Sequence, residues 1–553
     1  MQKLKLNFNN TFRKELTADP IAETYPRQVQ HAAYSEAMPV KVQQPNTIIV
    51  ATEVSKIFNF TEEFITSDDF AQIFTGNQLI EGMEPYAMCY GGFQFGNWAG
   101  QLGDGRAINL GEVFTEQHGS QTLQLKGAGP TPYSRTADGF AVLRSSVREF
   151  LCSEAMYHLG VPTTRALSLC LTGEEIIRDI MYDGNAKAEL GAVVCRVSSS
   201  FVRFGSIQLP AMRRDLELLT EMVNYSITHD FPHLLPQDKK ENNEENETVT
   251  QSSLITKEVY LAWFNEICET TSDLIIHWMR VGFVHGVMNT DNMSLIGETI
   301  DFGPYGWVDN FDLGWTPNTT DSQNKRYRFG GQSMISLWNL CQLANSLVPL
   351  IGSVEALQTK VESYTQMYEV KWHSMMMEKL GLTSNLADPK EETFIAKNLE
   401  FLLEEVETDM TIFYRLLASF NFSEHDMLSE DIFESLIKHF TPCYYNVDQL
   451  DDVYTQKLSL WLTKYHERFT LETYDDTVRA LKMNKVNPKY VLRNYLSQQA
   501  IDKAENGDFS EIHRLHELLK NPYDEQSEFE EYAGKRPDWA KNKVGCSMLS
   551  CSS

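Results

Sequence analysis

The stretch His285-Gly286-Val287-Met288-Asn289-Thr290-Asp291-Asn292, followed at 301 by Asp301-Phe302-Gly303, is the most informative part of this 553-residue chain. Asn292 and Asp301 carry hard oxygen donors, the ligands that Mg²⁺ or Mn²⁺ prefers when the ion bridges phosphates. An Asp-Phe-Gly tripeptide alone is common by chance. A histidine and an asparagine at fixed distances before it make chance a poor explanation, so the stretch predicts a metal–nucleotide site.

The same spacing is typical of a protein-kinase catalytic loop, in which H-R-D-L-x-x-x-N precedes D-F-G. In this chain Val287 stands where the kinase has its aspartate base, and a valine cannot accept the proton of a substrate hydroxyl. Asp291 is the nearest carboxylate that could take over that role. Its alternative role is purely structural, as a helix cap or a hydrogen-bond acceptor.

A second pattern lies upstream. Residues 122–126 alternate polar and apolar side chains, as a half-buried strand does, and end in Lys126. Residues 142–159 show the spacing of an amphipathic helix that contains Glu149, and residues 193–197 predict a further strand. A strand lysine paired with a carboxylate on the next helix positions phosphates in kinases. An unrelated surface lysine and a helix glutamate are the alternative explanation.

Two further groups of residues suit a polyphosphate. In the turn Gly103-Asp104-Gly105-Arg106, small residues would let backbone N–H groups approach a phosphate, and Arg106 could add bidentate contacts, although a simple hairpin turn explains the glycines equally well. Arg196 and Arg203 lie in apolar, strand-like surroundings, where an unpaired guanidinium is costly. A polyphosphate would explain both arginines, and salt bridges would explain either one.

Composition limits the partners. The formal charge of −28 and the pI of about 4.9 argue against general binding to nucleic acid or to an acidic membrane surface. The apolar stretch 274–288 is too short and too polar to span a bilayer. No signal or transit peptide is evident, and most of the nine cysteines are dispersed, so a cytoplasmic protein is expected. A monomer is expected, although no motif specifies the oligomeric state.

These patterns predict an α+β protein with a protein-kinase-like two-lobed fold. Residues 1–85 are expected to form an N-terminal arm on a nucleotide-binding core at 86–390, with a mobile surface loop at about 236–254. Residues 391–525 are expected to form a helical C-terminal extension. A flexible tail at 526–553 would then carry Cys546 and Cys551, two thiols accessible for redox exchange or simply part of an unconstrained tail.

With these residues in view, the chain resembles the selenoprotein O family of kinase-like protein adenylyltransferases, as a cysteine-containing member. The resemblance rests on the blocks 6–12, 95–106, 131–135, 143–151, 286–293 and 301–306. It implies that ATP binds in reversed orientation and that AMP moves to a Ser, Thr or Tyr hydroxyl of a protein while pyrophosphate leaves. The cofactors implied are ATP, as substrate, and Mg²⁺ or Mn²⁺.

The resemblance also assigns roles to single residues. Asp291 matches the family's proposed base, Asn292 and Asp301 match its metal ligands, and Glu149 matches the partner of Lys126. The residues that match nucleotide-binding positions are Gly103, Gly105, Arg106, Lys126, Asp138, Gly139, Arg196 and Arg203.

The chain departs from the family pattern near the tail. Many members have a cysteine shortly after the D-F-G segment that can pair with the tail, but residues 315–318 contain none. Cys546 and Cys551 are separated by four residues, where the family commonly has an adjacent pair. The chain therefore lacks, at 315–318, the cysteine that such a disulfide would use.

Two other functions remain open on the sequence. One is a kinase that transfers the γ-phosphoryl group with Asp291 as a displaced base. The other is a catalytically inactive pseudokinase that binds a nucleotide as a scaffold, although a scaffold has no need of both Asn292 and Asp301.

Overall fold

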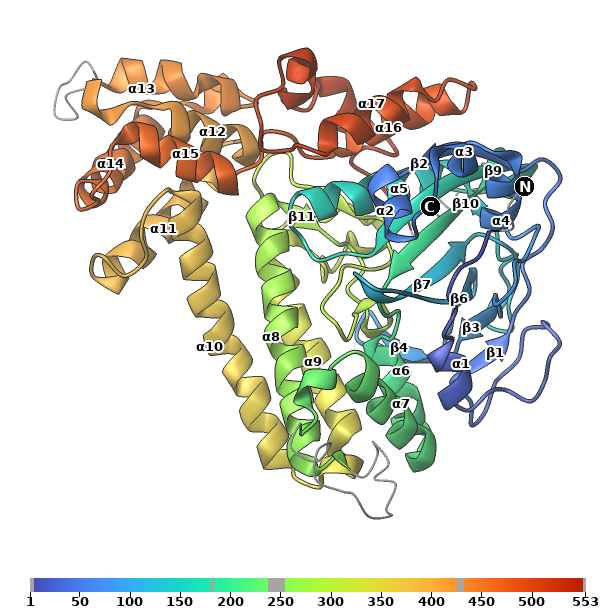
Figure 1. Cartoon of the computed structure of the whole chain (residues 1–553). Coiled ribbons are helices and arrows are strands. Elements are labelled where there is room, and N and C mark those ends of the chain that lie inside the picture. The colour runs from blue at the N-terminus through green and yellow to red at the C-terminus, as the bar shows by residue number, and fades with distance from the viewer. Residues whose placement is uncertain (1–3, 181–183, 237–253, 425–431, 551–553) are drawn as a thin grey trace.

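A computed structural model describes residues 4–180, 184–236, 254–424 and 432–550 of the chain. The predicted surface loop at about 236–254 lies almost wholly outside these residues. Strands occupy mainly the first 200 residues and helices the rest, which confirms a mixed α/β protein with antiparallel sheets. Figure 1 shows the main sheet on one side, three long helices beside it and the C-terminal helices above.

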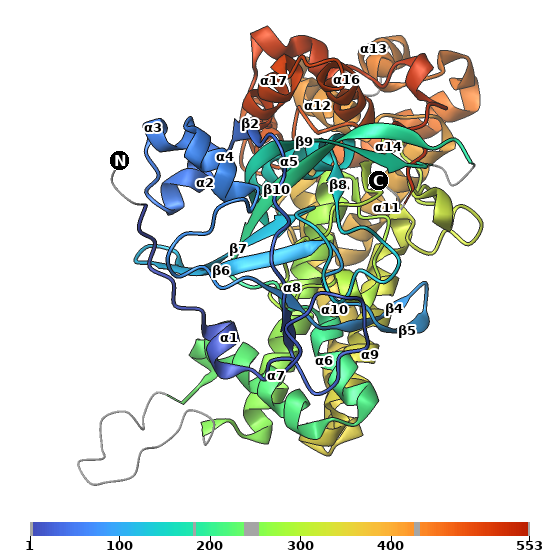
Figure 2. The same ribbon diagram turned by 90° about the vertical axis from the view of Figure 1, so that its right-hand side faces the viewer.

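The main sheet has eight antiparallel strands in the order β1-β3-β6-β7-β10-β9-β2, with β8 paired to β10. The strands span Tyr34–Glu36 (β1), Asn46–Val50 (β2), Tyr86–Met88 (β3), Ala107–Thr115 (β6), Gly119–Lys126 (β7), Ala141–Val142 (β8), Arg165–Arg178 (β9) and Lys187–Ser198 (β10). The predicted strands 122–126 and 193–197 are confirmed, and Lys126 lies opposite Val194 on β10. A separate hairpin, Gly91–Gln94 (β4) and Asn97–Gln101 (β5), lies between this sheet and α6 and α9 (Figures 1 and 2).

The N-terminal segment is more than the extended arm that the sequence predicted. It contains the short helices Thr11–Glu15 (α1), Thr52–Ile57 (α2), Glu62–Ile65 (α3) and Asp68–Phe74 (α4). Its strands β1 and β2 are the two outer strands of the main sheet, and β2 pairs with β9. Because these partners lie far away in sequence, the local pattern of prolines could not reveal them.

Helix α5, Leu143–His158, confirms the helix predicted over 142–159. Val147, Leu151 and Ala155 are fully buried at helical spacing where the helix packs on β9 and β10. Gly160, with a φ of 69°, follows the end of the helix, as glycine commonly does. The helix is thereby fixed against the sheet, with Glu149 on the side of Lys126.

The second half of the core is helical. It consists of α6 (Phe204–Arg213), α7 (Leu216–His229), α8 (Lys257–Val281), α9 (Gln332–Ile351) and α10 (Val354–Lys379). Between α8 and α9 the chain forms the small ladder of Phe283–Val284 (β11) with Gly306–Trp307 (β12). The motif at 285–303 lies between these two strands, so their pairing fixes both ends of the loop.

One described helical stretch, Phe329–Ile351, is long and apolar enough to cross a membrane, with a mean hydropathy of 1.3. Half of that window is buried, and α9 packs against α6, α8 and α10. Burial of this kind is typical of a helix in the core of a folded protein. Residues 274–288 are, as expected from the sequence, too short and too polar to span a bilayer, and α8 ends at Val281 within that stretch.

The predicted C-terminal helical extension is present. It comprises α11 (Pro389–Glu405), α12 (Met410–Ser419), α13 (Ile432–Phe440), α14 (Asp452–Phe469), α15 (Asp476–Val486), α16 (Asn494–Ala504) and α17 (Ser510–Leu519). Helices α11 to α15 share a hydrophobic cluster with the ends of α8 and α10, whereas α16 and α17 pack against α5.

The tail differs from the flexible segment that the sequence predicted. Phe529 and Tyr532 are buried, and Leu549 is hydrogen-bonded through its backbone to Pro317 (N to O, 3.0 Å) and Thr319 (O to N, 2.8 Å). Apolar side chains that local composition does not reveal therefore hold the described part of the tail against the core.

Candidate active site

Four charged side chains meet where the main sheet faces the 285–303 loop. Lys126 Nζ lies 2.8 Å from Glu149 Oε2 and 3.5 Å from Asp301 Oδ1. Arg196 Nη1 lies 3.2 Å from Glu149 Oε1 and 2.7 Å from Asp301 Oδ1. The predicted Lys126–Glu149 pair is present, and Asp301 joins it through both cations.

Arg203 extends this cluster. Its Nη1 lies 2.7 Å from Asp301 Oδ2 and donates a hydrogen bond of 2.9 Å to the Asp291 backbone oxygen. Its Nη2 has no hydrogen-bond partner and lies 4.0 Å from Asp104 Oδ1, on the other side. Arg203 therefore links the carboxylate of Asp301 to Asp291, the residue predicted as base.

The pKa values follow from burial and these charges. Burial would raise the pKa of Asp301, but Arg203, Arg196 and Lys126 together hold it well below its usual value. Burial lowers the pKa of Lys126, against the opposing effect of Glu149 and Asp301. Asp301 is thus a carboxylate shared by three cations, and its backbone is in the left-handed region, with a φ of 57°.

The loop itself is held by hydrogen bonds. His285 is buried; its Nε2 contacts the Ile300 oxygen at 2.9 Å, and its Nδ1 accepts the N–H of Val287 at 3.3 Å. Asn292 donates its side-chain N–H to the Val287 oxygen at 2.9 Å. The amide nitrogen of Asn292 is thereby used for structure, which leaves its amide oxygen for a cation.

Asp291 lies under the β4–β5 hairpin. Its Oδ2 accepts a hydrogen bond of 3.2 Å from Gln94, whereas its Oδ1 is buried and has no partner. A Cβ on Gly92 would lie 2.4 Å from that Oδ1, so only glycine fits here. Burial raises the pKa of Asp291 to about 6, against the opposing effects of Gln94 and Arg203.

The predicted phosphate turn is built around Tyr133. A Cβ on Gly103, which has a φ of 79°, would lie 2.3 Å from the Tyr133 ring, and one on Gly105 would lie 3.0 Å from its backbone oxygen. Packing thus explains both glycines. Arg106 lies close enough to Lys126 to lower its pKa, and within the described residues its guanidinium has no ion-pair partner.

Asp138 and Gly139 are not joined to this cluster by any described contact. Asp138 is half exposed and pairs with Arg178 at 2.7 Å. Gly139 packs on Gly129, where a Cβ would lie 2.3 Å from the backbone. Their predicted contact with a nucleotide stays a prediction.

The two tail cysteines are not a described redox pair. Cys546 is 3% exposed, and burial raises the pKa of its thiol to about 11, which contradicts the prediction of an accessible, reactive thiol. Cys551 lies outside the described residues. Where many family members have a cysteine after D-F-G, this chain pairs Pro317 and Thr319 with Leu549 through the backbone instead.

Several residues at the site were not predicted from the sequence. Gln94 contacts Asp291, Asp104 lies beside Arg203, and Gln124 accepts from Arg196 Nε at 2.9 Å. Gln124 could have been found from the strand pattern, because Arg196 lies opposite Gln124 in the β7–β10 register. Gln94 is at the end of β4, and Asp104 is in the turn after β5. Only the tertiary structure fixes the direction in which these turns place the two side chains.

The chain is similar to known proteins over nearly its whole length. Residues 22–520 match the model of a family described as protein adenylyltransferase SelO. The chain belongs to the SelO family. Relatives named protein nucleotidyltransferase YdiU are 51% identical in Azoarcus sp. and 49% identical in Rhodopirellula baltica, each over 99% of both chains. A third, from Flavobacterium johnsoniae, is 49% identical over the full length of both chains.

This SelO-family chain is therefore an enzyme, a nucleotidyltransferase. Membership extends over both the sheet and the helical extension, since the match runs from residue 22 to residue 520. The roles proposed for single residues rest on the geometry of the site.

Proposed function

We propose that the chain transfers AMP from ATP to a Ser, Thr or Tyr hydroxyl of an acceptor protein, in a kinase-like cleft that binds ATP in reversed orientation. The acceptor oxygen forms a bond to the α-phosphorus, and the bond between the α-phosphorus and the α–β bridging oxygen breaks. Pyrophosphate leaves, and the hydroxyl proton passes to Asp291.

The observation that carries this proposal is the unpartnered Oδ1 of Asp291. A buried carboxylate oxygen without a donor is costly, so its persistence needs a reason. A pKa raised to about 6 leaves Asp291 ionised near neutral pH and still basic enough to accept a proton. Because Gly92 and Gln94 cover the carboxylate, the acceptor hydroxyl reaches Oδ1 only when the hairpin moves aside.

The cationic side chains favour a site for pyrophosphate. Lys126, Arg196 and Arg203 converge on Asp301, and Arg196 and Arg203 are almost fully buried. Donors fixed in a site of low dielectric stabilise the charge that develops on a leaving group. With the β- and γ-phosphates at these cations, the α-phosphate is the one left toward Asp291, which is the reversed orientation.

The oxygen donors fit a divalent cation. Asp301 and the free amide oxygen of Asn292 supply two ligands, and Mg²⁺ commonly takes one or two protein ligands together with substrate phosphates. Among the described residues no group of three or more His, Cys, Asp or Glu side chains is suited to a metal, so any further ligands would have to come from the nucleotide and water. When bound, Mg²⁺ or Mn²⁺ would neutralise phosphate charge.

The proposal is tested by incubating the purified protein and candidate acceptor proteins with ATP labelled at the α- or the γ-phosphate. Label from α-ATP alone, lost in Asp291→Ala, is the expected result. Label from γ-ATP alone would instead identify a kinase with a displaced base. A chain that binds ATP and transfers no label from either position would be a nucleotide-binding scaffold.

A further inference from the structure

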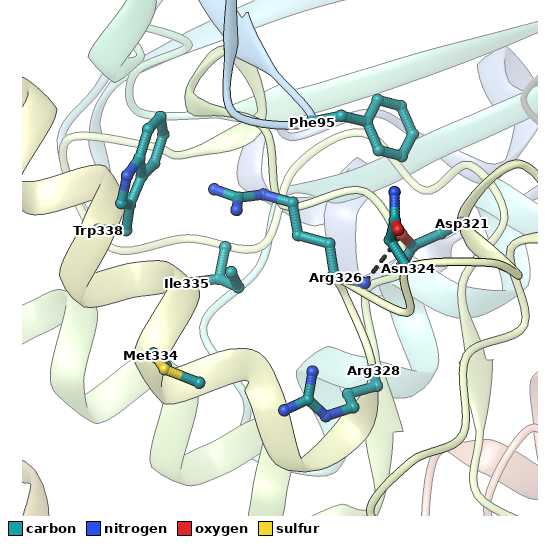
Figure 3. Close-up of a pocket in the computed structure, with 8 residues that line it drawn as sticks. All are labelled: Phe95, Asp321, Asn324, Arg326, Arg328, Met334, Ile335 and Trp338. Carbon is teal, nitrogen blue, oxygen red and sulfur yellow. Dashed lines mark hydrogen bonds between the residues drawn. The ribbon is translucent and has the colours of Figure 1, made fainter.

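A cavity of about 460 Å³ opens beside the β4–β5 hairpin (Figure 3). Its walls come from Phe95 at the tip of the hairpin, from Arg326 and Arg328 in the segment before α9, and from Met334 and Trp338 on α9. Phe95 and Met334 are 36% and 58% exposed, so the mouth of the cavity is apolar and open. The volume falls within the range of pockets that bind ligands in proteins.

The charges in this cavity are not neutralised. Among the described residues neither Arg326 nor Arg328 has a carboxylate within ion-pair distance, although the protein as a whole carries −28. The one carboxylate in the wall, Asp321, is buried and accepts the backbone N–H groups of Arg326 (2.9 Å) and Tyr327 (2.7 Å). It offsets part of the charge, but its oxygens are already used.

Arg326 is held ready for a ligand. Its guanidinium lies 4.7 Å from the centre of the Trp338 ring, and its Nε is buried without a hydrogen-bond partner. Stacking on an aromatic ring fixes the plane of a guanidinium and leaves its edge free for a carboxylate. Its buried Nε has no acceptor among the described residues, so the hydrogen-bonding capacity of this guanidinium is not fully used.

The cavity is tied to the proposed base by consecutive contacts. Asn289 Oδ1 accepts from the Phe95 backbone at 3.2 Å, Thr290 Oγ1 accepts from the Phe93 backbone at 2.8 Å, and Asp291 accepts from Gln94. Tyr327, next to Arg326, donates to Asn289 Oδ1 at 2.5 Å. A ligand in the cavity would therefore lie beside the hairpin that covers Asp291.

The tip of the hairpin is also strained. Phe95 has a φ of 50°, a left-handed conformation that is rare for an aromatic residue. Two hydrogen bonds from its N–H, to Tyr327 Oη at 2.9 Å and to Asn289, hold it there and turn its ring to the cavity. Strain of this kind persists where surrounding contacts impose it, commonly at ligand-binding sites.

We propose that this cavity, with Arg326 and Arg328, binds an acidic side chain of the acceptor protein next to the hydroxyl that receives AMP. The inference rests on the proposed function and adds a substrate class to it, acceptor segments that carry Asp or Glu near the modified residue. A basic, aromatic-walled cavity suits a carboxylate on a short apolar stem, and Lys or Arg in its place would be repelled.

Peptide binding tests this inference separately from catalysis. Short fluorescent peptides with one serine flanked by Glu, Ala or Lys are titrated with the full chain, with Mn²⁺ and a non-hydrolysable ATP analogue present, and followed by anisotropy. The Glu peptide should bind best. Arg328→Glu should weaken it by about tenfold or more, because a charge-assisted contact is replaced by repulsion, and should favour the Lys peptide.

Two controls complete the experiment. Arg514→Glu reverses the charge of an arginine whose side chain is 45% exposed and pairs with Glu531, far from the cavity in sequence, and should leave peptide binding unchanged. Arg326→Gln removes the charge but keeps a polar, unbranched side chain, and it should also weaken binding of the Glu peptide, which covers the case in which Arg328→Glu fails to fold.

The outcomes separate the two proposals. Equal binding of the three peptides, or no effect of either arginine variant, would overturn the acidic-segment inference whatever the label experiment shows. So would an equal loss of affinity for the ATP analogue in Arg326→Gln, because the cavity would then belong to the nucleotide. Preference for Glu peptides without any α-label would keep the binding site and refute adenylyl transfer.

Discussion

Asp301→Asn is the most informative single substitution in the cluster. The carboxylate of Asp301 lies 2.7 Å from Arg196, 2.7 Å from Arg203 and 3.5 Å from Lys126. Removing one partner of a buried ion pair typically costs about 3 to 5 kcal/mol, because the remaining charge stays buried. For 553 residues the entropy of unfolding is about 1.2 kcal/mol/K, so Tm should fall by about 3 to 4 °C.

Although Asp301→Asn lowers Tm, metal-free ATP should raise Tm more in this variant than in the wild type. In the wild type, phosphates compete with the Asp301 carboxylate for the same three cations, and in Asp301→Asn that competitor is gone. ATP in the presence of a chelator should therefore raise Tm more in the variant than in the wild type and recover most of the lost 3 to 4 °C. Adenylyl transfer should nevertheless be lost, because a proposed metal ligand is missing.

Asp309→Asn is the matched control. Asp309 has 12% of its side chain exposed and pairs with Arg493 at 3.2 Å, but it lies outside the cluster. Its loss should lower Tm by a similar amount and leave the effect of metal-free ATP as in the wild type. The reasoning is wrong if metal-free ATP stabilises Asp301→Asn no more than Asp309→Asn, as measured by thermal unfolding in parallel.

Three other predictions concern single carboxylates and one glycine. With Asp291 as base, the rate of AMP transfer should rise with pH and level off above about pH 6, and Asp291→Asn should remove the rise and lower the rate by about 10² to 10⁴. Gly92→Ala places a Cβ 2.4 Å from Asp291 Oδ1 and should lower kcat about a hundredfold, with Gly534→Ala, where the nearest atom is 3.6 Å away, as a control that stays active. Burial raises the pKa of Asp230 to about 7, so the folded state binds its proton more tightly than the unfolded state and stability falls as pH rises toward 7. Asp230→Asn should therefore gain stability over the wild type at pH 8 and not at pH 4 in urea unfolding; equal gains at both would contradict the assignment.

The sequence predicted the parts of this site that depend on local pattern. Alternation located the strand that ends in Lys126, helical spacing placed Glu149 on α5, and the two elements meet at 2.8 Å. The spacing from Asn292 to Asp301 likewise located two oxygen donors at one loop. The strand and helix signals repeat a period of 2 or about 3.6 residues, and the third is a fixed spacing within one loop.

Other parts could not be predicted because distant segments create them. Gln94 reaches Asp291 across 197 residues of sequence. The outer strand β2 pairs with β9, which lies far from it in sequence. Gly92 is a glycine because Asp291 approaches it closely, which no local pattern could show. Only the folded chain shows which neighbour a glycine accommodates.

The cations of the cluster are balanced by carboxylates, which would govern how this acidic protein binds a triphosphate. Lys126, Arg196 and Arg203 are not free cations, because Glu149, Asp301 and Asp104 face them at 4.0 Å or less. A bare triphosphate entering this balanced cluster would meet these carboxylates as well as the cations, and like charges at such distances repel strongly in a low dielectric. A divalent ion held by Asp301 and Asn292 would supply positive charge that offsets that repulsion, while Arg106 adds a positive charge that no described carboxylate pairs with. Nucleotide affinity should therefore depend on the metal through Asp301 more than on any single cation.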